Sequence, residues 1–539
     1  MGNWNFADVW EVIASQQPDA PAQVHGGRRS TWAEFDRRAD GVGRALLDAG
    51  ATRQDKVAQY LHNGPEYLES TYACFKAGLV PVNTNYRYGG DELVYLWDNS
   101  DAVAVVFHGT FGEQIEAVRP RLPGVRTWFW VDDGSGPCPG WAVPYEAAAT
   151  APGPRAVPPW GRSGDDLVLL YTGGTTGMPK GVMWRQDDLF MALSASGARR
   201  FPDDGGPDDV AAMGGEPGTG LVCLPAAPLM HGTGAFVALT MLNDGGSIVT
   251  LTGRRLDVED LLDTVQAESA NVLAIVGDAF AKPMVAALDA DPGRWDLSSL
   301  FMVISSGVMW SSATKEALLR HAPKALLVDQ FSSSEALGMG RSVARSGRPA
   351  PTARFRLSDR TRVVTDDGRF LEPGSGETGR VAVSGRTPTG YYKDPAKSAE
   401  TFPVIDGERW SVPGDYAQVE SDGTLRLLGR GSVCINTGGE KVYPEEVEEA
   451  LKTDPSVHDA VVVGIPDERF GEAVVAVVEP GPGATVDAAA LIDGIKAHLA
   501  SYKAPRQVVT IDTIGRAPNG KVDYKRLRAH ALDQIGTSP

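Results

Sequence analysis

The stretch Tyr171–Val182 reads YTGGTTGMPKGV, and it decides how the remainder of the chain is interpreted. Glycines let the backbone turn sharply and let amide N–H groups gather around an anion. Threonine hydroxyls add hydrogen-bond donors, and the ammonium of Lys180 adds a positive charge on a flexible stem. These residue types favour a phosphate-binding loop made of Thr172, Gly173, Gly174, Thr175, Thr176, Gly177 and Lys180.

The segments on either side of this loop are apolar. Asp166–Tyr171 (DLVLLY) predicts a buried strand, and Lys180–Arg185 (KGVMWR) predicts a second one. The Walker A pattern GxxxxGK[ST] cannot be fitted across the loop, and GxGxxG, GxSxG and HExxH do not occur. An ordinary Gly/Thr turn is the alternative, but the order of residues is too particular for it.

The whole chain has the composition of a globular enzyme with more than one domain. It has 539 residues, 42% of them apolar and 22% charged. The net charge of −18 argues against a nucleic-acid partner, which needs a basic face, and against adsorption on anionic membranes. No apolar run approaches the roughly 18 residues that span a bilayer, and the N-terminus is not a secretory signal.

Cysteine usage predicts a reducing compartment. Four cysteines lie far apart without a CxxC pair, which disfavours a disulfide framework and a zinc site. We therefore expect a cytoplasmic protein.

Short apolar runs alternate with helical patterns along most of the chain, which predicts layered α/β structure. Residues 375–430 are expected to be β-rich. Pro137–Trp160 is expected to be a surface crossing and Pro202–Gly220 a polar loop. Helices are predicted at Ser30–Gly50 (with Gly50 as C-cap), Thr71–Val80 (ending at Gly78, with the strand PVN after it), Ala235–Leu242, Asp257–Ser269, Ala279–Asp289, Ser311–Ala322, Pro444–Leu451 and Leu491–Leu499.

Three further motifs carry polar residues where ligands commonly bind. In open α/β sheets ligands lie beyond the carboxyl ends of the strands, and two predicted loops, Ser305–Val308 and Gln330–Ala336, lie there. His231 stands in Pro228–Gly234 (PLMHGTG) between a predicted strand and a helix. A lone histidine in an apolar setting is more often a core residue than a functional one.

These motifs together resemble the AMP-forming adenylating enzymes, which include acyl-CoA synthetases, firefly luciferase and nonribosomal-peptide adenylation domains. The family's phosphate loop reads roughly YTSGTTGxPKG, so Gly173 replaces a hydroxyl residue. The resemblance covers essentially the whole chain and is closest to bacterial fatty-acyl and steroid side-chain acyl-CoA synthetases. It rests on TGGTTGMPKGVMWRQ, GYYKDP, PGDYAQVE and GRGSVCINTGGEKVYPEEVE.

The resemblance implies roles for the residues around the nucleotide. Phe331 would stack on adenine, the Ser334 hydroxyl would bond the α-phosphate, and Glu335 would hold Mg²⁺. Ser332 replaces the family's glycine, so its side chain would crowd the adenine or the acyl pocket. The other implied nucleotide contacts are Ser306, Gly307, Val308, Gln330, Ser333 and the two ribose contacts Asp415 and Arg430.

The resemblance also implies how acid and coenzyme A are handled. His231 would lie at the carboxylate end of the acyl pocket, and Lys521 in PNGKVDYKRLR would be a catalytic ammonium, with Thr175 and Lys180 as further catalytic groups. Ser432 would be a hinge, so that residues 1–431 form the AMP-binding domain and residues 432–539 a mobile C-terminal domain. The coenzyme A tunnel would be lined by Gly438, Gly439 and Glu440.

The expected fold is therefore α/β, with a large N-terminal domain of layered α/β subdomains plus a β-rich subdomain and a small mobile α+β domain. The expected reaction activates an apolar carboxylic acid with ATP and Mg²⁺ and transfers the acyl group to coenzyme A. The sequence also allows a homodimer. Alternatives are an aryl-acid CoA ligase, an adenylation enzyme that loads a separate carrier protein, and a non-catalytic nucleotide sensor.

Overall fold

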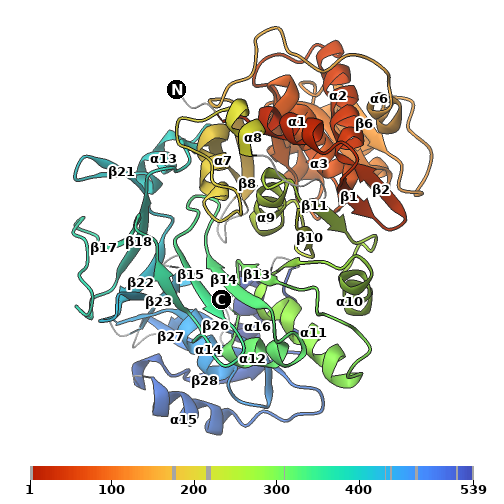
Figure 1. Cartoon of the computed structure of the whole chain (residues 1–539). Helices are drawn as coiled ribbons and strands as arrows, with labels where there is room; N and C mark the ends of the chain where they lie inside the picture. The colour runs from red at the N-terminus through yellow and green to blue at the C-terminus, as the bar shows by residue number, and fades with distance from the viewer. Residues whose placement is uncertain are drawn as a thin grey trace.

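Figure 1 shows the chain as a computed structural model built around three sheets. The structure describes residues 4–172, 178–213, 220–308, 310–430, 433–437, 440–467, 471–499, 501–517 and 520–536. Two of the sheets belong to the N-terminal part, and the third is formed after residue 433.

One N-terminal sheet carries the strands on both sides of the phosphate loop. Its order is β19-β9-β8-β4-β3-β5-β6-β7, parallel from β8 to β7 and antiparallel at β8–β9 and β9–β19. The predicted strand Lys180–Arg185 is confirmed with the same bounds. The strands are β3 (Lys56–Tyr60), β4 (Val80–Asn83), β5 (Ala102–His108), β6 (Thr127–Val131), β7 (Val143–Pro144), β8 (Leu167–Thr172), β9 (Lys180–Arg185) and β19 (Gly390–Tyr391).

The other N-terminal sheet changes from parallel to antiparallel along its length. Its first part runs β1-β11-β10-β12-β13-β14 in parallel register and then continues into an antiparallel meander at the left of Figure 1. The parallel part comprises β1 (Pro21–His25), β10 (Val222–Pro225), β11 (Ser247–Thr250), β12 (Val272–Ile275), β13 (Met302–Ser306) and β14 (Leu326–Phe331). The antiparallel strands are β2 (Arg28–Thr31), which pairs with β1, and β15 (Gly340–Ala344), β16 (Arg354–Leu357), β17 (Thr361–Val364), β18 (Gly379–Ser384), β20 (Val404–Ile405), β21 (Glu408–Ser411), β22 (Asp415–Val419) and β23 (Thr424–Arg430).

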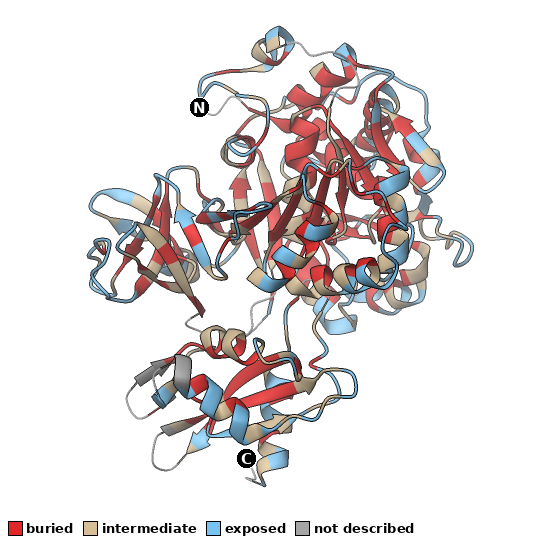
Figure 2. Ribbon diagram, turned by 60° about the horizontal axis from the view of Figure 1, so that its bottom comes forward, coloured by how far each residue is buried: buried red, intermediate tan, exposed pale blue. Residues whose placement is uncertain are grey.

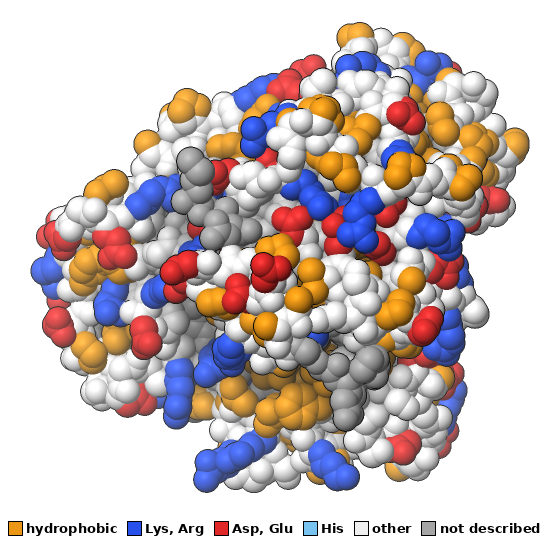
Figure 3. Space-filling model, turned by 45° about the horizontal axis from the view of Figure 1, so that its top comes forward, with side chains coloured by type: hydrophobic (Ala, Val, Ile, Leu, Met, Phe, Trp, Pro, Cys, Tyr) orange, Lys and Arg blue, Asp and Glu red, His pale blue; other side chains and the backbone are white. Residues whose placement is uncertain are grey.

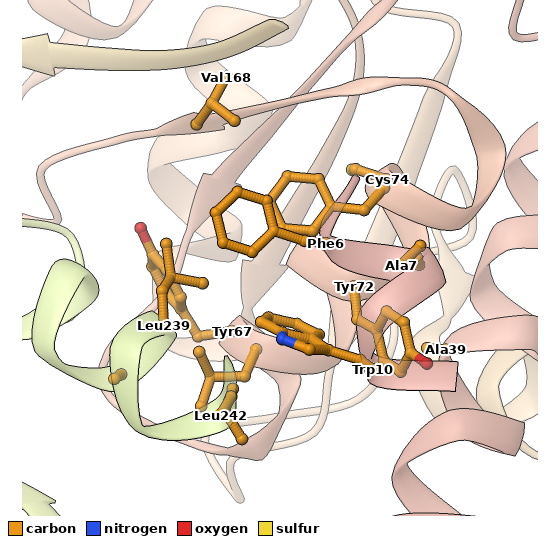
Figure 4. Close-up of a cluster of buried hydrophobic side chains, with 14 of the residues drawn as sticks. Phe6, Ala7, Trp10, Ala39, Tyr67, Tyr72, Cys74, Val168, Leu239 and Leu242 are labelled. Carbon is orange, nitrogen blue, oxygen red and sulfur yellow. The ribbon is translucent and has the colours of Figure 1, made fainter. Parts of the chain in front are cut away.

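Helices surround both sheets, and one aromatic-rich core joins them (Figure 4). In it the rings of Phe6 and Phe75 stack at 5.0 Å, and Leu239 and Val168 belong to the same cluster. The core therefore fixes the helix that follows His231 relative to the strand that leads into the phosphate loop. The helices are α1 (Phe6–Gln16), α2 (Trp32–Asp48), α3 (Pro65–Ala77), α4 (Gly90–Asn99), α5 (Gly112–Val118), α6 (Tyr145–Ala149), α7 (Gln186–Ser194), α8 (Pro207–Met213), α9 (Gly232–Asn243), α10 (Val258–Ala267), α11 (Gly277–Ala290), α12 (Ser312–His321) and α13 (Pro395–Thr401).

A buried charge cluster fastens α1, α2 and α3 together. The ammonium of Lys76 is fully buried and lies 2.8 Å from Glu11, 2.7 Å from Asp36 and 2.9 Å from Asp40. Arg155 approaches Glu11 at 2.9 Å from the segment that crosses the surface before β8. Removing one member of such a cluster leaves a buried charge uncompensated, which is strongly destabilising.

The part of the chain after residue 433 forms its own sheet and its own cluster of buried hydrophobic residues, at the bottom of Figures 1 and 2. Its sheet order is β25-β24-β27-β26, and β28 pairs with β27 in parallel. The predicted helix Pro444–Leu451 is confirmed with the same bounds. The elements are β24 (Ile435–Thr437), β25 (Glu440–Val442), α14 (Pro444–Leu451), β26 (Val457–Asp467), β27 (Gly471–Pro480), α15 (Ala488–His498), β28 (Gln507–Thr510) and α16 (Tyr524–Ile535).

The fold class expected from the sequence is confirmed, and some local expectations are wrong. The helix expected at Thr71–Val80 begins earlier, at Pro65, because Pro suits the first helical turn. Helix α8 lies inside the segment expected to be a loop, since Asp208 and Asp209 stabilise a helix N-terminus. The C-cap of α2 is Ala49, and Gly50 follows it with a φ of 82°.

On the face in Figure 3, basic and acidic side chains are interspersed over the described residues, as expected of a solvated surface. Among the helices that the structure describes, none has the length and apolar character needed to cross a bilayer.

Candidate functional site

The hairpin of β8 and β9 holds the two ends of the phosphate loop together. Thr172 faces Lys180 in the antiparallel register. Gly173, Gly174, Thr175, Thr176 and Gly177 lie outside the described residues.

Asn83, at the carboxyl end of β4, fastens the strand that enters this loop. Its side-chain amide donates to the carbonyl oxygens of Tyr171 at 2.9 Å and Met230 at 2.8 Å, and its side-chain oxygen accepts from the Tyr171 amide at 2.6 Å. Asn83 is buried, so these bonds are shielded from water. One side chain therefore fixes the end of β8 relative to the segment that precedes His231.

Lys180 begins β9 and projects toward the segment after β19. Its ammonium lies 2.6 Å from a carboxylate oxygen of Asp394 and 5.8 Å from the ring centroid of Tyr391. The Lys180 side chain is 42% exposed. The ammonium is thus accessible to an anion, and its three donors allow it to bind phosphate while it keeps a protein partner.

The end of β14 carries the next group of expected site residues. Gln330 and Phe331 belong to the strand, which extends further than the sequence predicted, and the Phe331 ring packs against Phe355 at 5.4 Å. The Ser332 hydroxyl accepts from the Gly338 amide at 3.1 Å, and the Ser333 hydroxyl accepts from the Ala336 amide at 3.1 Å. Both hydroxyls therefore stabilise the loop's own turn, and the role of Phe331 against adenine stays a prediction.

Ser334 and Glu335 are held in place by residues of three other strands, β9, β21 and β19. The indole N–H of Trp184, on β9, donates to the Ser334 carbonyl at 2.9 Å. The hydroxyl of Ser411, on β21, donates to the Glu335 carbonyl at 2.6 Å. The hydroxyl of Tyr391 donates to the Glu335 carboxylate at 2.9 Å. Backbone and side chain of Glu335 are therefore both fixed.

His231 lies at the start of α9, as its N-cap. Burial, and after it the positive charges of Lys521 and Arg87, lower the pKa of His231 to about 4. The imidazole is consequently neutral near pH 7. Lys521 is far from His231 in sequence, yet its charge contributes to this lowering of the His231 pKa.

The loop that carries Lys521 contacts the loop after β13. Gly520 has a φ of 73°, and a Cβ on it would overlap the side chain of Val308. Gly307 also has a positive φ, 94°, and the backbone of Ser306 accepts a bond from Thr233 at 3.4 Å. The SSGV loop therefore meets both α9 and the lysine-bearing loop.

Some of the remaining expected site residues lie among the described residues, and others lie outside them. Asp415 is buried and faces Arg430 in the backbone register of β22 and β23, as two ribose contacts from one edge would require. Ser432, Gly438 and Gly439 lie outside the described residues, and Glu440 begins β25. The roles of these residues as ribose contacts, hinge and coenzyme A tunnel stay predictions.

The sequence argument did not assign roles to Asn83, Tyr391 or Asp394. Asn83 was visible only as the last residue of a short strand, PVN. The motif GYYKDP was noticed as part of the resemblance, and its repeated aromatics beside an Asp were the available signal.

The described residues provide too few ligands to hold a metal ion by themselves, so a bound substrate would have to provide the others. Among them, no group of three or more His, Cys, Asp or Glu is arranged to hold a metal. Glu335 offers one carboxylate fixed by Tyr391, whose ring also lies 5.8 Å from the Lys180 ammonium. Mg²⁺ typically binds through one or two carboxylates together with substrate phosphates. The donor set therefore suits a metal that arrives with a polyphosphate.

Comparisons with known proteins find relatives that match nearly the whole chain. A relative from Mycobacterium tuberculosis, a medium/long-chain-fatty-acid–CoA/3-oxocholest-4-en-26-oate–CoA ligase, is 40% identical over 97% of this chain and 95% of that protein. The 3-oxocholest-4-en-26-oate–CoA ligase of Rhodococcus rhodochrous is 40% identical over 99% of this chain and 96% of that protein.

Solved structures have the same architecture. ATP-bound MatB from Rhodopseudomonas palustris superposes with a TM-score of 0.80 at 26% identity, over 99% of this chain and 100% of that one. An anthranilate CoA ligase in complex with anthranoyl-AMP gives a TM-score of 0.84 over 99% of both chains, and at 22% identity it supports the fold alone. The AMP-binding enzyme model matches residues 10–392, and the AMP-binding enzyme C-terminal domain matches residues 446–521. The chain belongs to the AMP-binding enzyme family.

Proposed function

We propose that this enzyme is an AMP-forming acyl-CoA synthetase that converts an apolar carboxylic acid, ATP and coenzyme A into acyl-CoA, AMP and pyrophosphate. The observation that carries the proposal is the position of the loop that holds Lys521, because its neighbour Gly520 packs against Val308 in the loop after β13. An ammonium carried by this loop, beyond the carboxyl end of β13, suits a reaction in which a carboxylate meets a phosphate.

In the first step a carboxylate oxygen bonds to the α-phosphorus of ATP, and the bond from that phosphorus to the bridging oxygen breaks as pyrophosphate leaves. Lys521 lies between the two reacting anions and stabilises the charge that develops on them. Lys180 and Ser334 orient the phosphates, and catalysis of this kind is mainly positioning and charge stabilisation.

Mg²⁺, bound with ATP at Glu335, would neutralise phosphate charge. Its requirement is tested by pyrophosphate exchange in Glu335→Ala, which we expect to fall strongly.

In the second step the coenzyme A sulfur bonds to the acyl carbonyl carbon and AMP leaves. Neutral His231 at the acid end of the pocket adds no second positive charge beside Lys521. We propose that the chain divides at residues 431 and 432, with Ser432 as the hinge, and that the C-terminal domain rotates between the steps. The pantetheine arm would then pass Gly438, Gly439 and Glu440.

The substrate class follows from the relatives and from the side chains near His231. The relatives named above act on fatty acids and on a steroid side-chain acid. Behind His231, Gly232 faces the ring of Phe236 and the side chain of Leu170, which make apolar surroundings. We therefore propose a fatty acid or a steroid side-chain acid, and propose a homodimer as the assembly to test.

The deciding experiment measures AMP release with a panel of acids, in the presence and absence of coenzyme A and without any carrier protein. We expect the highest kcat/KM for long or polycyclic apolar acids and strict dependence on coenzyme A. Highest kcat/KM for hydroxycinnamates would instead identify an aryl-acid ligase. AMP release that needs an added carrier protein would identify a carrier-loading enzyme.

A further inference from the structure

The segment from Gly390 to Asp394, which we call the GYYKD segment, lies directly against the strand that carries Lys180. Gly390 and Tyr391 pair with Met183 and Val182 of β9, and the Tyr392 amide donates to the Gly181 carbonyl at 2.8 Å. Backbone hydrogen bonds thus attach the segment to the strand that follows the phosphate loop.

The position of Tyr391 within this segment is fixed from several sides. Its amide donates to the Ser398 hydroxyl at 2.8 Å, and a Cβ on Gly390 would lie 2.8 Å from that same hydroxyl, so glycine is required there. The Tyr391 side chain is 7% exposed, and its ring lies 5.8 Å from that of Phe402. The phenol therefore has little freedom to change its direction.

The Tyr391 phenol contacts both charged groups at the phosphate end of the site. Its hydroxyl donates to one oxygen of the Glu335 carboxylate at 2.9 Å, and its ring face lies 5.8 Å from the Lys180 ammonium. The hydroxyl can be satisfied by one carboxylate oxygen, which leaves lone pairs on the other oxygen for a cation. Hydrogen bonds to a charged acceptor are stronger than those between neutral groups.

Asp394 fixes the opposite end of the segment. One of its oxygens accepts from the Lys397 amide at 2.9 Å and caps α13, while the other lies 2.6 Å from Lys180. The Lys180 ammonium holds the pKa of Asp394 below its ordinary value. Lys180 and Glu335 come from different sheets, and the GYYKD segment is the element that contacts both.

We propose that Tyr391 is a positioning residue for adenylation: its hydroxyl sets the orientation in which the Glu335 carboxylate receives the metal ion of metal–ATP. The proposal rests on the proposed function for the role of Glu335. It assigns Tyr391 no contact with substrate. Its effect is confined to the metal-dependent step, because Glu335 has no part in the transfer of the acyl group to sulfur.

The test compares Tyr391→Phe with Tyr392→Phe. Both remove one hydroxyl from the same segment, but the Tyr392 hydroxyl donates to Asp101 at 2.7 Å and not to a site residue. Mn²⁺ is titrated into enzyme with a non-hydrolysable ATP analogue, and free Mn²⁺ is followed by electron paramagnetic resonance. Losing one hydrogen bond to a charged group predicts a Kd for Mn²⁺ raised by roughly tenfold in Tyr391→Phe.

Tyr392→Phe is expected to match the wild type, and binding of the ATP analogue without metal is expected to be unchanged in both variants. Pyrophosphate exchange by Tyr391→Phe should recover at high Mg²⁺, and conversion of supplied acyl-AMP with coenzyme A should be unchanged. A Kd for Mn²⁺ within twofold of wild type overturns the proposal.

A double-mutant cycle gives a second test of the link between Tyr391 and Glu335. In a Glu335→Gln background, which retains an acceptor for the phenol, adding Tyr391→Phe should cause no further loss of Mn²⁺ binding. An equal further loss contradicts the proposal. Wild-type enzyme without any pyrophosphate exchange would refute the proposed function instead, while the Mn²⁺ titration would still decide the role of Tyr391.

Discussion

The two sides of the candidate site are held in place by different kinds of interaction. On the N-terminal side, Asn83, Trp184 and Ser411 make hydrogen bonds of 2.6 to 2.9 Å to loop backbone, with Asn83 and Ser411 buried. On the side contributed after residue 433, Lys282 donates to the His458 carbonyl in an exposed setting, and Arg426 lies 3.5 Å from Glu446. The first of these contacts is an exposed hydrogen bond, and the second is a partly buried ion pair with Arg426 37% and Glu446 11% exposed. A solvent-exposed ion pair contributes about 0–1 kcal/mol, whereas a buried polar group left unpaired costs about 1–3 kcal/mol.

This difference predicts that the part after residue 433, and not the N-terminal part, moves during the reaction. The N-terminal residues keep one arrangement throughout the reaction, because breaking it would expose several buried polar groups. The described contacts of the C-terminal side include the polar contacts of Lys282 and Arg426, the ring pair of Tyr416 and Tyr443 at 5.4 Å, and the fit of Gly520 against Val308. We expect this side to be the one that moves between the two half-reactions. The predictions below test this contrast, beginning with the largest expected effect.

Lys521→Ala should remove the group that the C-terminal side brings to the reaction. One such donor contributes about 10²–10³ in rate, so adenylate formation should fall by that factor. The variant should still convert supplied acyl-AMP and coenzyme A to thioester. The two half-reactions are measured separately by pyrophosphate exchange and by thioester formation. Equal loss in both, with native-like folding, would show that the two sides do not separate.

Gly520→Ala should weaken docking without removing Lys521. The positive φ of Gly520 and the overlap with Val308 together oppose any side chain there. Strain of about 1–3 kcal/mol predicts roughly tenfold to hundredfold slower adenylation. Adding Val308→Ala should restore part of the rate, because it removes the overlap. A Gly520→Ala variant with wild-type pyrophosphate exchange would mean that this contact does not hold the adenylating arrangement.

Asn83→Ala should damage the N-terminal side and therefore affect every activity. It leaves the amide and carbonyl of Tyr171 and the carbonyl of Met230 without this buried partner, which predicts a fall of about 3 kcal/mol in the free energy of unfolding. Denaturant unfolding and both half-reactions are measured beside Asn85→Ala, whose side chain accepts one exposed bond from the Arg87 amide. Selective loss of adenylation alone would contradict the contrast.

The titration of His231 should report whether the lysine loop is docked in solution. Its pKa of about 4 is lowered first by burial and then by Lys521, so Lys521→Gln should raise it. The imidazole is neutral in the folded chain down to about pH 4 but is protonated in the unfolded chain below about pH 6.5. Its contribution to stability is therefore present above pH 6.5 and is lost as the pH falls toward 4. Histidine NMR titration checks the direction, and an unchanged pKa in Lys521→Gln would place the loop away from His231.

Local patterns were sufficient for much of the fold and for part of the site. The strand Lys180–Arg185 and the helix Pro444–Leu451 were predictable because apolar alternation and an N-terminal proline are local signals. Glu335 and Lys521 were expected from ordered motifs. The bonds of Asn83 to Met230 and of Tyr391 to Glu335 join residues far apart in the chain, and no pattern of spacing encodes which strands become neighbours.

Strand β9 links the positions of two charged groups of the site, the Lys180 ammonium and the Glu335 carboxylate. It carries Lys180 at its first residue, pairs with Tyr391 through Val182, and reaches the Ser334 carbonyl through Trp184. A displacement of β9 would therefore move the Lys180 ammonium and the Glu335 carboxylate together. Such a displacement would change the position of each group more than it changes the separation between them.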